Sequence, residues 1–251
     1  MIILAIESSA LTASVAVCDG ERLLGEYTLN NGNTHSETLL PMAESLLNSL
    51  DLSVSDVDLF AVTAGPGSFT GVRIGVSTLK GLAFSSQKPC VGVSTLEALA
   101  HNFPVPGGLI CPVMNARRKQ VYTALFREKN GELIRLIPDS AIAITELDEI
   151  LATYDEPVYL VGDGYNVTTE NLKHAIGATP ERLQWQSAAS VAKAAYAAYL
   201  SGNTVSDAEL KPVYLRPCQA ERERLEKESM KKEEKNNEAE YDSHWLRSRR
   251  I

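Results

Sequence analysis

The spacing of hydrophobic residues divides the first hundred positions into short apolar runs and longer segments with helical periodicity. The short runs predict strands over 2–6, 13–18, 23–29, 58–64 and 90–93. Apolar side chains three and four apart predict helices over 34–50, 70–86 and 95–102. Asp19-Gly20 stands at hairpin spacing between the second and third runs. The first three strands are therefore expected to form an antiparallel meander.

The first predicted helix has start and stop signals of its own. Thr34 and Glu37 have the spacing of a capping box, in which each side chain binds a free backbone N–H at the helix start. Pro41 is expected to bend the helix or to mark its first turn. The helix carries a broad apolar stripe, made of Leu39, Leu40, Ala43, Leu46, Leu47 and Leu50.

The second half repeats the pattern of the first more loosely. Strands are predicted over 109–115, 120–127, 132–137 and 158–161, and helices over 146–154 and 188–200. Two rounds of three strands, a helix, a strand and a helix indicate a duplicated α/β fold. Prolines and glycines cluster at 102–108. The predicted parts are a first lobe (1–103), a second lobe (104–220) and a charged tail (221–251), helical or disordered.

Composition narrows the classes of function. The net charge of -8 argues against tight unaided binding to a phosphate backbone, so any contact with nucleic acid is expected to be indirect. The four cysteines lie far apart, which predicts reduced thiols. The apolar run at the N-terminus is too short to span a bilayer, so a cytoplasmic protein is expected.

The glycine-rich run from Ala64 to Gly75 lies between a predicted strand and a predicted helix. Glycines allow a tight turn there, and a helix N-terminus presents backbone N–H groups that can bind an anion. An equally supported interpretation is that Gly71 and Gly75 form a flat helix face against which a neighbouring helix packs closely. The residues alone leave both interpretations open.

The turn after the first strand is a second candidate for phosphate binding. Glu7 could act through a metal ion, but no second acid follows it in the turn. The four histidines form no pair at metal-ligand spacing, so no metal site is predicted. The combined candidate nucleotide or phosphate loop is Glu7, Ser8, Ser9, Gly65, Gly67, Ser68 and Gly71.

Four segments together resemble one family of bacterial tRNA-modification proteins. They are the opening AIESS, Thr34-His35-Ser36-Glu37, the run AGPGSFTGVRIG and KPVYLRP at 211–217. Over residues 1–220 the chain is similar to the TsaB (YeaZ) family. The resemblance implies a two-lobed α/β fold of the actin, hexokinase and Hsp70 class, in which each lobe is a mixed sheet flanked by helices.

The resemblance also implies a subunit without catalytic residues of its own. In the sister protein TsaD, which transfers threonylcarbamoyl to tRNA, a pair of histidines on a helix after the last strand of the first lobe holds the metal. The corresponding segment here, 94–100, contains no histidine. The family's role is to act as a scaffold that lets TsaD modify the adenosine next to the anticodon.

The implied partners follow from the same resemblance. TsaD binds directly, TsaE joins in a ternary complex, tRNA is contacted indirectly, ATP or ADP is held only in the complex with TsaD, and a homodimer forms without TsaD. The expected interface is His35, Leu39, Met42, Leu46, Leu47, Phe69, Arg73, Val76, Leu79 and Lys80.

Three alternatives stay open. The two helices that carry these interface residues could simply pack on the chain's own sheet. The chain could be an ATP-dependent phosphotransferase or hydrolase that uses Glu7, Ser9 and the 65–71 loop. The weakest alternative is a peptidase, for which the sequence offers neither a metal site nor a GxSxG motif.

Overall fold

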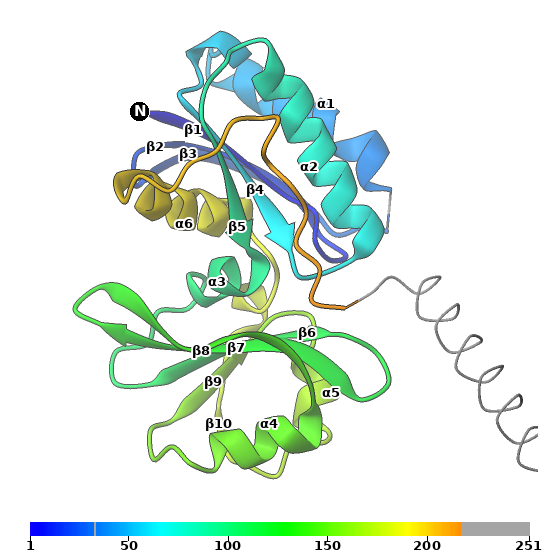
Figure 1. Cartoon of the computed structure of the whole chain (residues 1–251), viewed down its shortest axis with the longest axis vertical. Helices are drawn as coiled ribbons and strands as arrows, with labels where there is room; N and C mark the ends of the chain where they lie inside the picture. Colours follow the sequence, from blue (N-terminus) through cyan, green and yellow to red (C-terminus); the bar gives the residue numbers. More distant parts are fainter. Residues whose placement is uncertain (33, 217–251) are drawn as a thin grey trace, which may run out of the picture. The chain divides into compact units, whose positions relative to one another are not determined.

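The computed structural model describes residues 1–32 and 34–216, of which Met1–Leu215 form one compact unit. Its first sheet has the order β3-β2-β1-β4-β5 (Figure 1). β1 pairs antiparallel with β2 and parallel with β4, as a meander followed by crossovers requires. The strands are β1 (Ile2–Glu7), β2 (Ala13–Asp19), β3 (Arg22–Leu29), β4 (Leu59–Gly65) and β5 (Cys90–Ser94).

The second sheet repeats the plan of the first. Its order is β10-β9-β6-β7-β8, with β6 antiparallel to β7 and parallel to β9. Its strands are β6 (Leu109–Asn115), β7 (Gln120–Lys129), β8 (Glu132–Ala143), β9 (Val158–Val161) and β10 (Ile176–Gly177). The predicted duplicated α/β fold, with a mixed sheet flanked by helices in each repeat, is confirmed.

Six α-helices connect the strands in the described part of the chain. They are α1 (His35–Ser49), α2 (Phe69–Phe84), α3 (Thr95–Ala100), α4 (Ile144–Leu151), α5 (Tyr165–Thr169) and α6 (Ala188–Leu200). Two 3-10 turns, η1 (Val54–Asp56) and η2 (Glu181–Leu183), complete the set. Of the six α-helices, the sequence predicts all except α5, which is too short to show a helical period.

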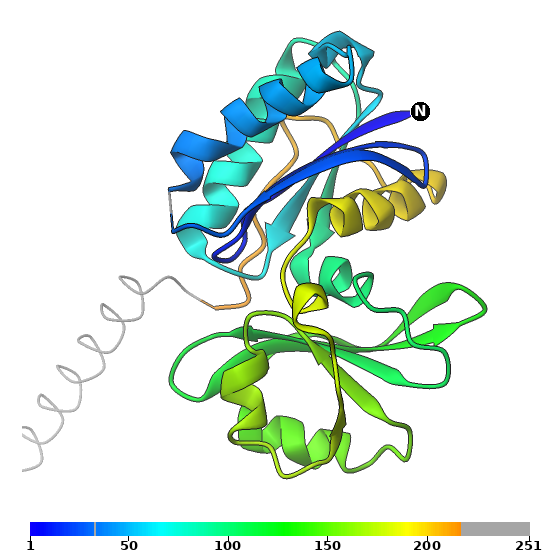
Figure 2. The same cartoon turned by 180° about the vertical axis from the view of Figure 1, so that it is seen from behind.

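Helices cover both faces of the first sheet (Figure 2). Because side chains alternate along a strand, Leu4 and Ile6 of β1 pack with α1 and α2, while Ile3 and Ala5 pack with α6. This position of α6 differs from the predicted division, which includes residues 188–200 in the second lobe. The alanine-rich face of α6 fits closely against the first sheet, so the chain returns to it after the second sheet is complete.

The short helix α3 lies between the two sheets (Figure 1). Its Leu96, Leu99 and Ala100 fill a core with side chains from β6 and β7. The opposite face of the second sheet packs on α4 and has its own core. Whether the boundary near residue 103 separates independently folding parts stays a prediction.

The start of α1 differs from its prediction. Thr34 is the N-cap residue, but its side chain makes no capping hydrogen bond, so the predicted capping box is wrong. The Thr34 carbonyl instead accepts hydrogen bonds from the Glu37 amide (3.0 Å) and the Thr38 hydroxyl (3.3 Å). Pro41 lies inside the helix, beyond its first turn.

Two further predictions concern the cysteines and the tail. Cys18, Cys90 and Cys111 are buried free thiols, as predicted. Cys218 and the charged tail at 221–251 lie outside the described residues. Within residues 1–32 and 34–216, no helix is long and apolar enough to cross a membrane.

Candidate functional site

The predicted phosphate-loop residues come together where β1 and β4 end. Parallel neighbouring strands bring their carboxyl ends to the same edge of a sheet, so the turn after Glu7 meets the turn after Gly65. The Ser68 amide donates a hydrogen bond to the Ser9 carbonyl (2.7 Å), and the Ser8 hydroxyl donates one to the Gly71 carbonyl (2.9 Å). The two turns are therefore bonded to each other.

The glycines of this edge lie in close contact with the turn after β1. A methyl group at Gly71 would overlap the Ser8 carbonyl oxygen, one at Gly75 would overlap the Ser8 hydroxyl, and one at Gly67 would overlap the Ser9 carbonyl. The glycines thus allow the turn after β1 to lie against α2. Gly71 and Gly75 pack closely on Ser8 of the turn after β1, and Gly71 also lies beside the His35 ring at the start of α1, as the close-packing interpretation expects.

Glu7 is sealed inside this contact, with no exposed surface. Its Oε1 accepts hydrogen bonds from the amide (2.6 Å) and the hydroxyl (2.5 Å) of Ser9. Its Oε2 is buried near Thr63 and has no hydrogen bond from the described residues. Burial raises the pKa of Glu7 to about 7, although the hydrogen bonds from Ser9 oppose this shift. A partly protonated, enclosed carboxyl group is a poor ligand for a divalent cation.

A second acid, Asp163, follows β9 and belongs to the same region. Burial raises the pKa of Asp163 to about 6, and its charge adds to the rise at Glu7. The Gln186 amide nitrogen donates to Asp163 (3.3 Å), and the Gln186 amide oxygen accepts from the Thr12 hydroxyl (3.3 Å). This chain of contacts was not predicted from the sequence. The Gly-Asp-Gly after a predicted strand is the signal that could have revealed Asp163.

The residues at this edge do not fit a metal-bound nucleotide. Among the residues that the structure describes, no group of three or more His, Cys, Asp or Glu side chains is arranged to hold a metal ion. Of the glycines in the candidate phosphate loop, Gly71 and Gly67 are already in close contact with Ser8 and Ser9, and Gly65 is in close contact with the Val213 backbone. The edge joins strands and a helix within the chain.

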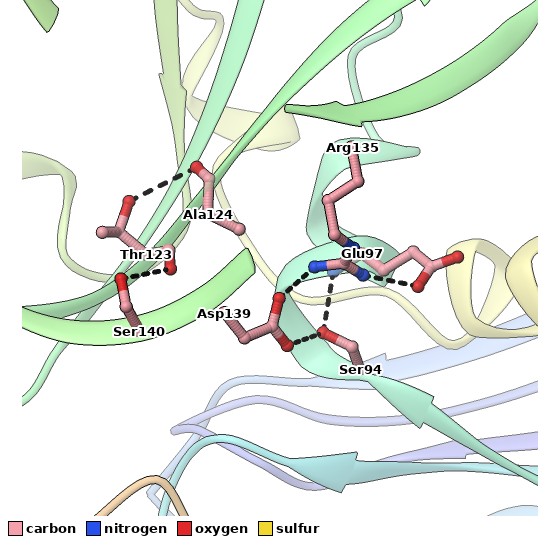
Figure 3. Close-up of polar contacts among 7 residues, drawn as sticks. All are labelled: Ser94, Glu97, Thr123, Ala124, Arg135, Asp139 and Ser140. Atoms are coloured by element: carbon pink, nitrogen blue, oxygen red, sulfur yellow. Dashed lines mark hydrogen bonds and ion pairs between the residues drawn. The ribbon is translucent and has the colours of Figure 1, made fainter. Parts of the chain in front are cut away.

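The start of α3, where the resemblance places the histidines of TsaD, carries an ion-pair network instead (Figure 3). The Ser94 hydroxyl donates to Asp139 (2.5 Å) and accepts from the Glu97 amide (3.2 Å). Arg135 forms ion pairs with Glu97 (2.7 Å) and with Asp139, and its guanidinium lies over the Phe126 ring. Ser94 and Glu97 thereby connect the first sheet's last strand and α3 to β8.

Most of the predicted partner interface lies in the chain's own core. Six of its ten residues are buried against the first sheet, which is the alternative that the sequence left open. They are Leu39, Met42, Leu46, Leu47, Val76 and Leu79.

The other four predicted interface residues contact neighbouring turns and the segment after α6. The His35 ring nitrogen Nε2 lies 2.8 Å from the Ala10 carbonyl oxygen. Phe69 stacks on Tyr214, and Arg73 lies over Phe69 and donates to the Tyr214 hydroxyl (2.8 Å). Lys80 donates to backbone carbonyls of the same segment, those of Ala208 and Leu210 (3.3 Å each).

Apart from Arg73, which is exposed on α2, the outward faces of α1 and α2 carry different residues from those predicted. Leu40 is 52% exposed and Phe84 is 76% exposed, although both are large and apolar. A shallow hollow of about 430 Å³ on α1 is lined by Pro41, Glu44, Ser45, Asn48 and Ser49. Leu40 belongs to the predicted stripe but points away from the core. We call these outward-facing residues of α1 and α2, with Leu40 and Phe84, the exposed helix face.

The glycines of α2 allow a matched test of the filled turn. Gly71→Ala should lower the free energy of unfolding by about 1–3 kcal/mol, because its methyl group would overlap the Ser8 backbone. Gly81→Ala, in the same helix with nothing near its Cβ position, should raise it by about 0.5–1 kcal/mol. Urea unfolding of both variants measures the difference. If both substitutions changed the free energy of unfolding equally, the turn after β1 would not pack against α2.

The family and the relatives that this sequence matches agree with the fold described above. Residues 23–221 match the family model of TsaD, tRNA N6-adenosine threonylcarbamoyltransferase. The TsaB protein of Bacillus subtilis, named for tRNA threonylcarbamoyladenosine biosynthesis, is 38% identical over 177 residues, which cover 70% of this chain and 77% of that protein. The Haemophilus influenzae TsaB protein is 32% identical over 230 residues, which cover 85% of this chain and 93% of that protein.

A solved structure shows the same relationship. YeaZ from Pseudomonas aeruginosa superposes with a TM-score of 0.76 at 28% identity, over 85% of this chain and 99% of that one. The similarity in sequence and in structure extends across both sheets. The chain therefore belongs to the TsaB (YeaZ) family, which shares the threonylcarbamoyltransferase family model.

Proposed function

We propose that this chain is a non-catalytic subunit that binds TsaD and enables transfer of threonylcarbamoyl to the tRNA adenosine next to the anticodon. Its relatives are named for the biosynthesis of that modified nucleoside, which supports a role in the pathway. Two features of the structure support the more specific proposal of a non-catalytic, TsaD-binding subunit. They are the close packing of the candidate phosphate site and the exposed surface of α1 and α2.

The observation that carries the proposal is the filled turn between β1 and α2. Catalysis by a phosphate-binding fold needs open backbone donors at this place and an ionised carboxylate with room for a cation. Here Ser8 and Ser9 occupy the space beside the glycines of α2, and Glu7 is fully buried with a pKa of about 7. These features favour a structural role for the turn.

The exposed helix face supports the binding part of the proposal. α1 and α2 pack on each other and on the first sheet, and their outer side keeps Leu40 and Phe84 in contact with solvent. Aromatic side chains such as that of Phe84 are enriched at protein interfaces, and the cores of interfaces are more apolar than the rest of a protein surface. We therefore place the TsaD contact on the outer side of the two helices, and not on the buried leucine stripe.

The remaining partners follow from the same arrangement. TsaE would bind the assembled pair, and ATP or ADP would be held on surfaces that this chain shares with TsaD, because its own turn is closed. Without TsaD, the exposed helix face of one copy would pair with that of a second copy in a homodimer. Contact with tRNA would come through the complex, in the cytoplasm.

One observation favours the second candidate, an ATP-dependent phosphotransferase or hydrolase. The Oε2 atom of Glu7 is buried without a hydrogen bond from the described residues, and Asp163 is close enough to affect the charge of Glu7. Two acids near each other could serve such chemistry if the turn opened. Calorimetry of ATP with the isolated chain tests this candidate: binding with turnover would favour it over the scaffold.

Substitution on the exposed helix face tests the proposed function. Leu40→Asp should weaken the association with TsaD by about 10- to 100-fold, since it places a charge in an apolar contact. Leu200→Asp is the matched control, because Leu200 is 67% exposed at the end of α6 and lies off that face. Calorimetric titration of TsaD with each variant gives the dissociation constants. Equal constants for the two variants would remove the exposed helix face from the interface.

A further inference from the structure

One polar contact links a turn of the first sheet to a turn of the second. Gln186 lies between η2 and α6, where the chain returns to the first sheet, and it is 2% exposed. Its amide nitrogen donates to Asp163 (3.3 Å) after β9, and its amide oxygen accepts from Thr12 (3.3 Å) before β2. A single side chain therefore bonds to both turns. We call Glu7, Thr12, Asp163 and Gln186 the acid contact.

The backbone on both sides of Gln186 is fixed by further hydrogen bonds. The Asn102 side chain, just after α3, donates to the Trp185 carbonyl (2.7 Å). The Ser187 hydroxyl donates to Glu26 of β3 (2.7 Å). Because its neighbours are held, the Gln186 side chain keeps its two partners only while the two turns stay together.

The acid contact contains two carboxyl groups and no positive charge. Glu7 is fully buried, and its Oε2 atom and the nearby Thr63 hydroxyl have no hydrogen bond from the described residues. Burial raises the pKa of Glu7 to about 7 and the pKa of Asp163 to about 6. A buried carboxylate without a cation is costly, so each acid favours either a proton or access to water.

Among the charged groups around the acid contact, Asp163 has the largest effect on the pKa of Glu7. At Asp163, burial outweighs the hydrogen bonds from Gln186 and from the Asn115 amide. Ionisation of the contact therefore depends first on its own two acids. The other titratable or charged side chains on the surrounding elements are Glu26 of β3, His35 of α1, Glu97 and His101 at α3, Tyr165 of α5, Lys193 of α6 and the exposed basic residues at 117–119.

We propose that the acid contact is a pH-dependent switch between the two sheets, closed while its acids are protonated and opened when they ionise. Once their protons pass to solvent, Glu7 and Asp163 repel each other and gain hydration when the turns separate. Both acids have a raised pKa, so the closed contact is favoured fully below pH 3.8 and is lost as the pH rises through 6 and 7. The switch belongs to the chain alone and does not depend on TsaD.

Amide hydrogen exchange of the full chain, followed by NMR between pH 5.5 and pH 8, tests the switch. The reporters are the Ser9 amide, which donates to Glu7 (2.6 Å), and the Ala188 amide, which donates to the Ser14 hydroxyl (3.2 Å). Each exchange rate is divided by the intrinsic rate of that amide at the same pH, which gives a protection factor. Amides of β4, in the middle of the first sheet, report global unfolding.

Four proteins are compared, and circular dichroism confirms that each is folded. They are the wild type, the double variant Glu7→Gln/Asp163→Asn, the single variant Asp163→Asn, and the control Glu44→Gln/Glu132→Gln, which removes two exposed carboxylates. The single variant keeps the test decisive if the double variant does not fold.

In the wild type and in the control, protection of the two reporters should fall at least about tenfold from pH 5.5 to pH 8. The fall should be smaller in Asp163→Asn and absent in the double variant. The β4 amides should stay better protected than the reporters throughout, because the contact opens without global unfolding. Three results would overturn the proposal: no fall in the wild type, an equal fall in the acid variants, or reporters as well protected as β4.

Discussion

Leu46→Ala is expected to lower the free energy of unfolding by about 2–5 kcal/mol, because it leaves a cavity in the core under α1. Leu46 is only 2% exposed, and its side chain packs against Gly25 of β3. Leu40→Ala, in the same helix, should change the free energy by less than about 0.5 kcal/mol, since Leu40 is mostly in solvent. Urea unfolding of the two variants gives both values.

The two variants show whether the leucine stripe of α1 belongs to the chain's own core or to a partner interface. If the leucines that the sequence assigns to the partner interface were surface residues, Leu46→Ala would leave the isolated chain as stable as Leu40→Ala does. A loss of stability confined to Leu46→Ala shows that the stripe belongs to the fold.

Glu7→Gln should stabilise the chain at pH 8 by up to about 3 kcal/mol and have little effect at pH 4.5. The pKa of Glu7 is raised from 4.5 to about 7, so the folded state binds a proton that the unfolded state has released between these values. The contribution of Glu7 to stability is therefore fully present below pH 4.5 and is lost as the pH rises through 7. Glutamine keeps the acceptor for Ser9 and carries no charge.

The measurement is urea unfolding of wild type and Glu7→Gln between pH 4.5 and 8. Glu44→Gln, at an exposed position on α1, is the matched control for the removal of one carboxylate. The difference between wild type and Glu7→Gln should grow with pH, while the control shows no such trend. A Glu7→Gln variant that is less stable at pH 8 than the wild type would mean that the ionised carboxylate is needed, as a cation-binding residue would be.

The fold was largely predictable because its strands and helices have strong periodic patterns. The two rounds of strands and helices in the sequence correspond to the two sheets, and the strand order then follows from meander and crossover rules. α5 and β10 were missed because five and two residues are too few to show a period. The return of α6 to the first sheet was missed because an alanine-rich face fits either sheet.

The sequence predicts which residues come together at the candidate site, but not how closely they pack there. Strand order alone brings Glu7 and Gly65 to one edge of the sheet. Whether Gly71 leaves room for a phosphate depends on the distance to Ser8, which no local pattern contains. Periodicity likewise places Leu39 and Leu46 on one helix face, but it does not tell whether the chain's own sheet or a partner protein covers that face. The left-handed backbone at Arg117 has no local signal either, since arginine rarely adopts it.

The most direct test of the account is threonylcarbamoyl transfer to tRNA by TsaD, TsaE and the enzyme that forms the threonylcarbamoyl adenylate. The reaction is run without this chain, with wild type, with Leu40→Asp and with Glu7→Gln. Transfer is expected to require the chain, Leu40→Asp should lower transfer together with TsaD binding, and Glu7→Gln should retain both. Transfer without the chain, or a Glu7→Gln variant that binds TsaD normally but no longer supports transfer, would contradict this account.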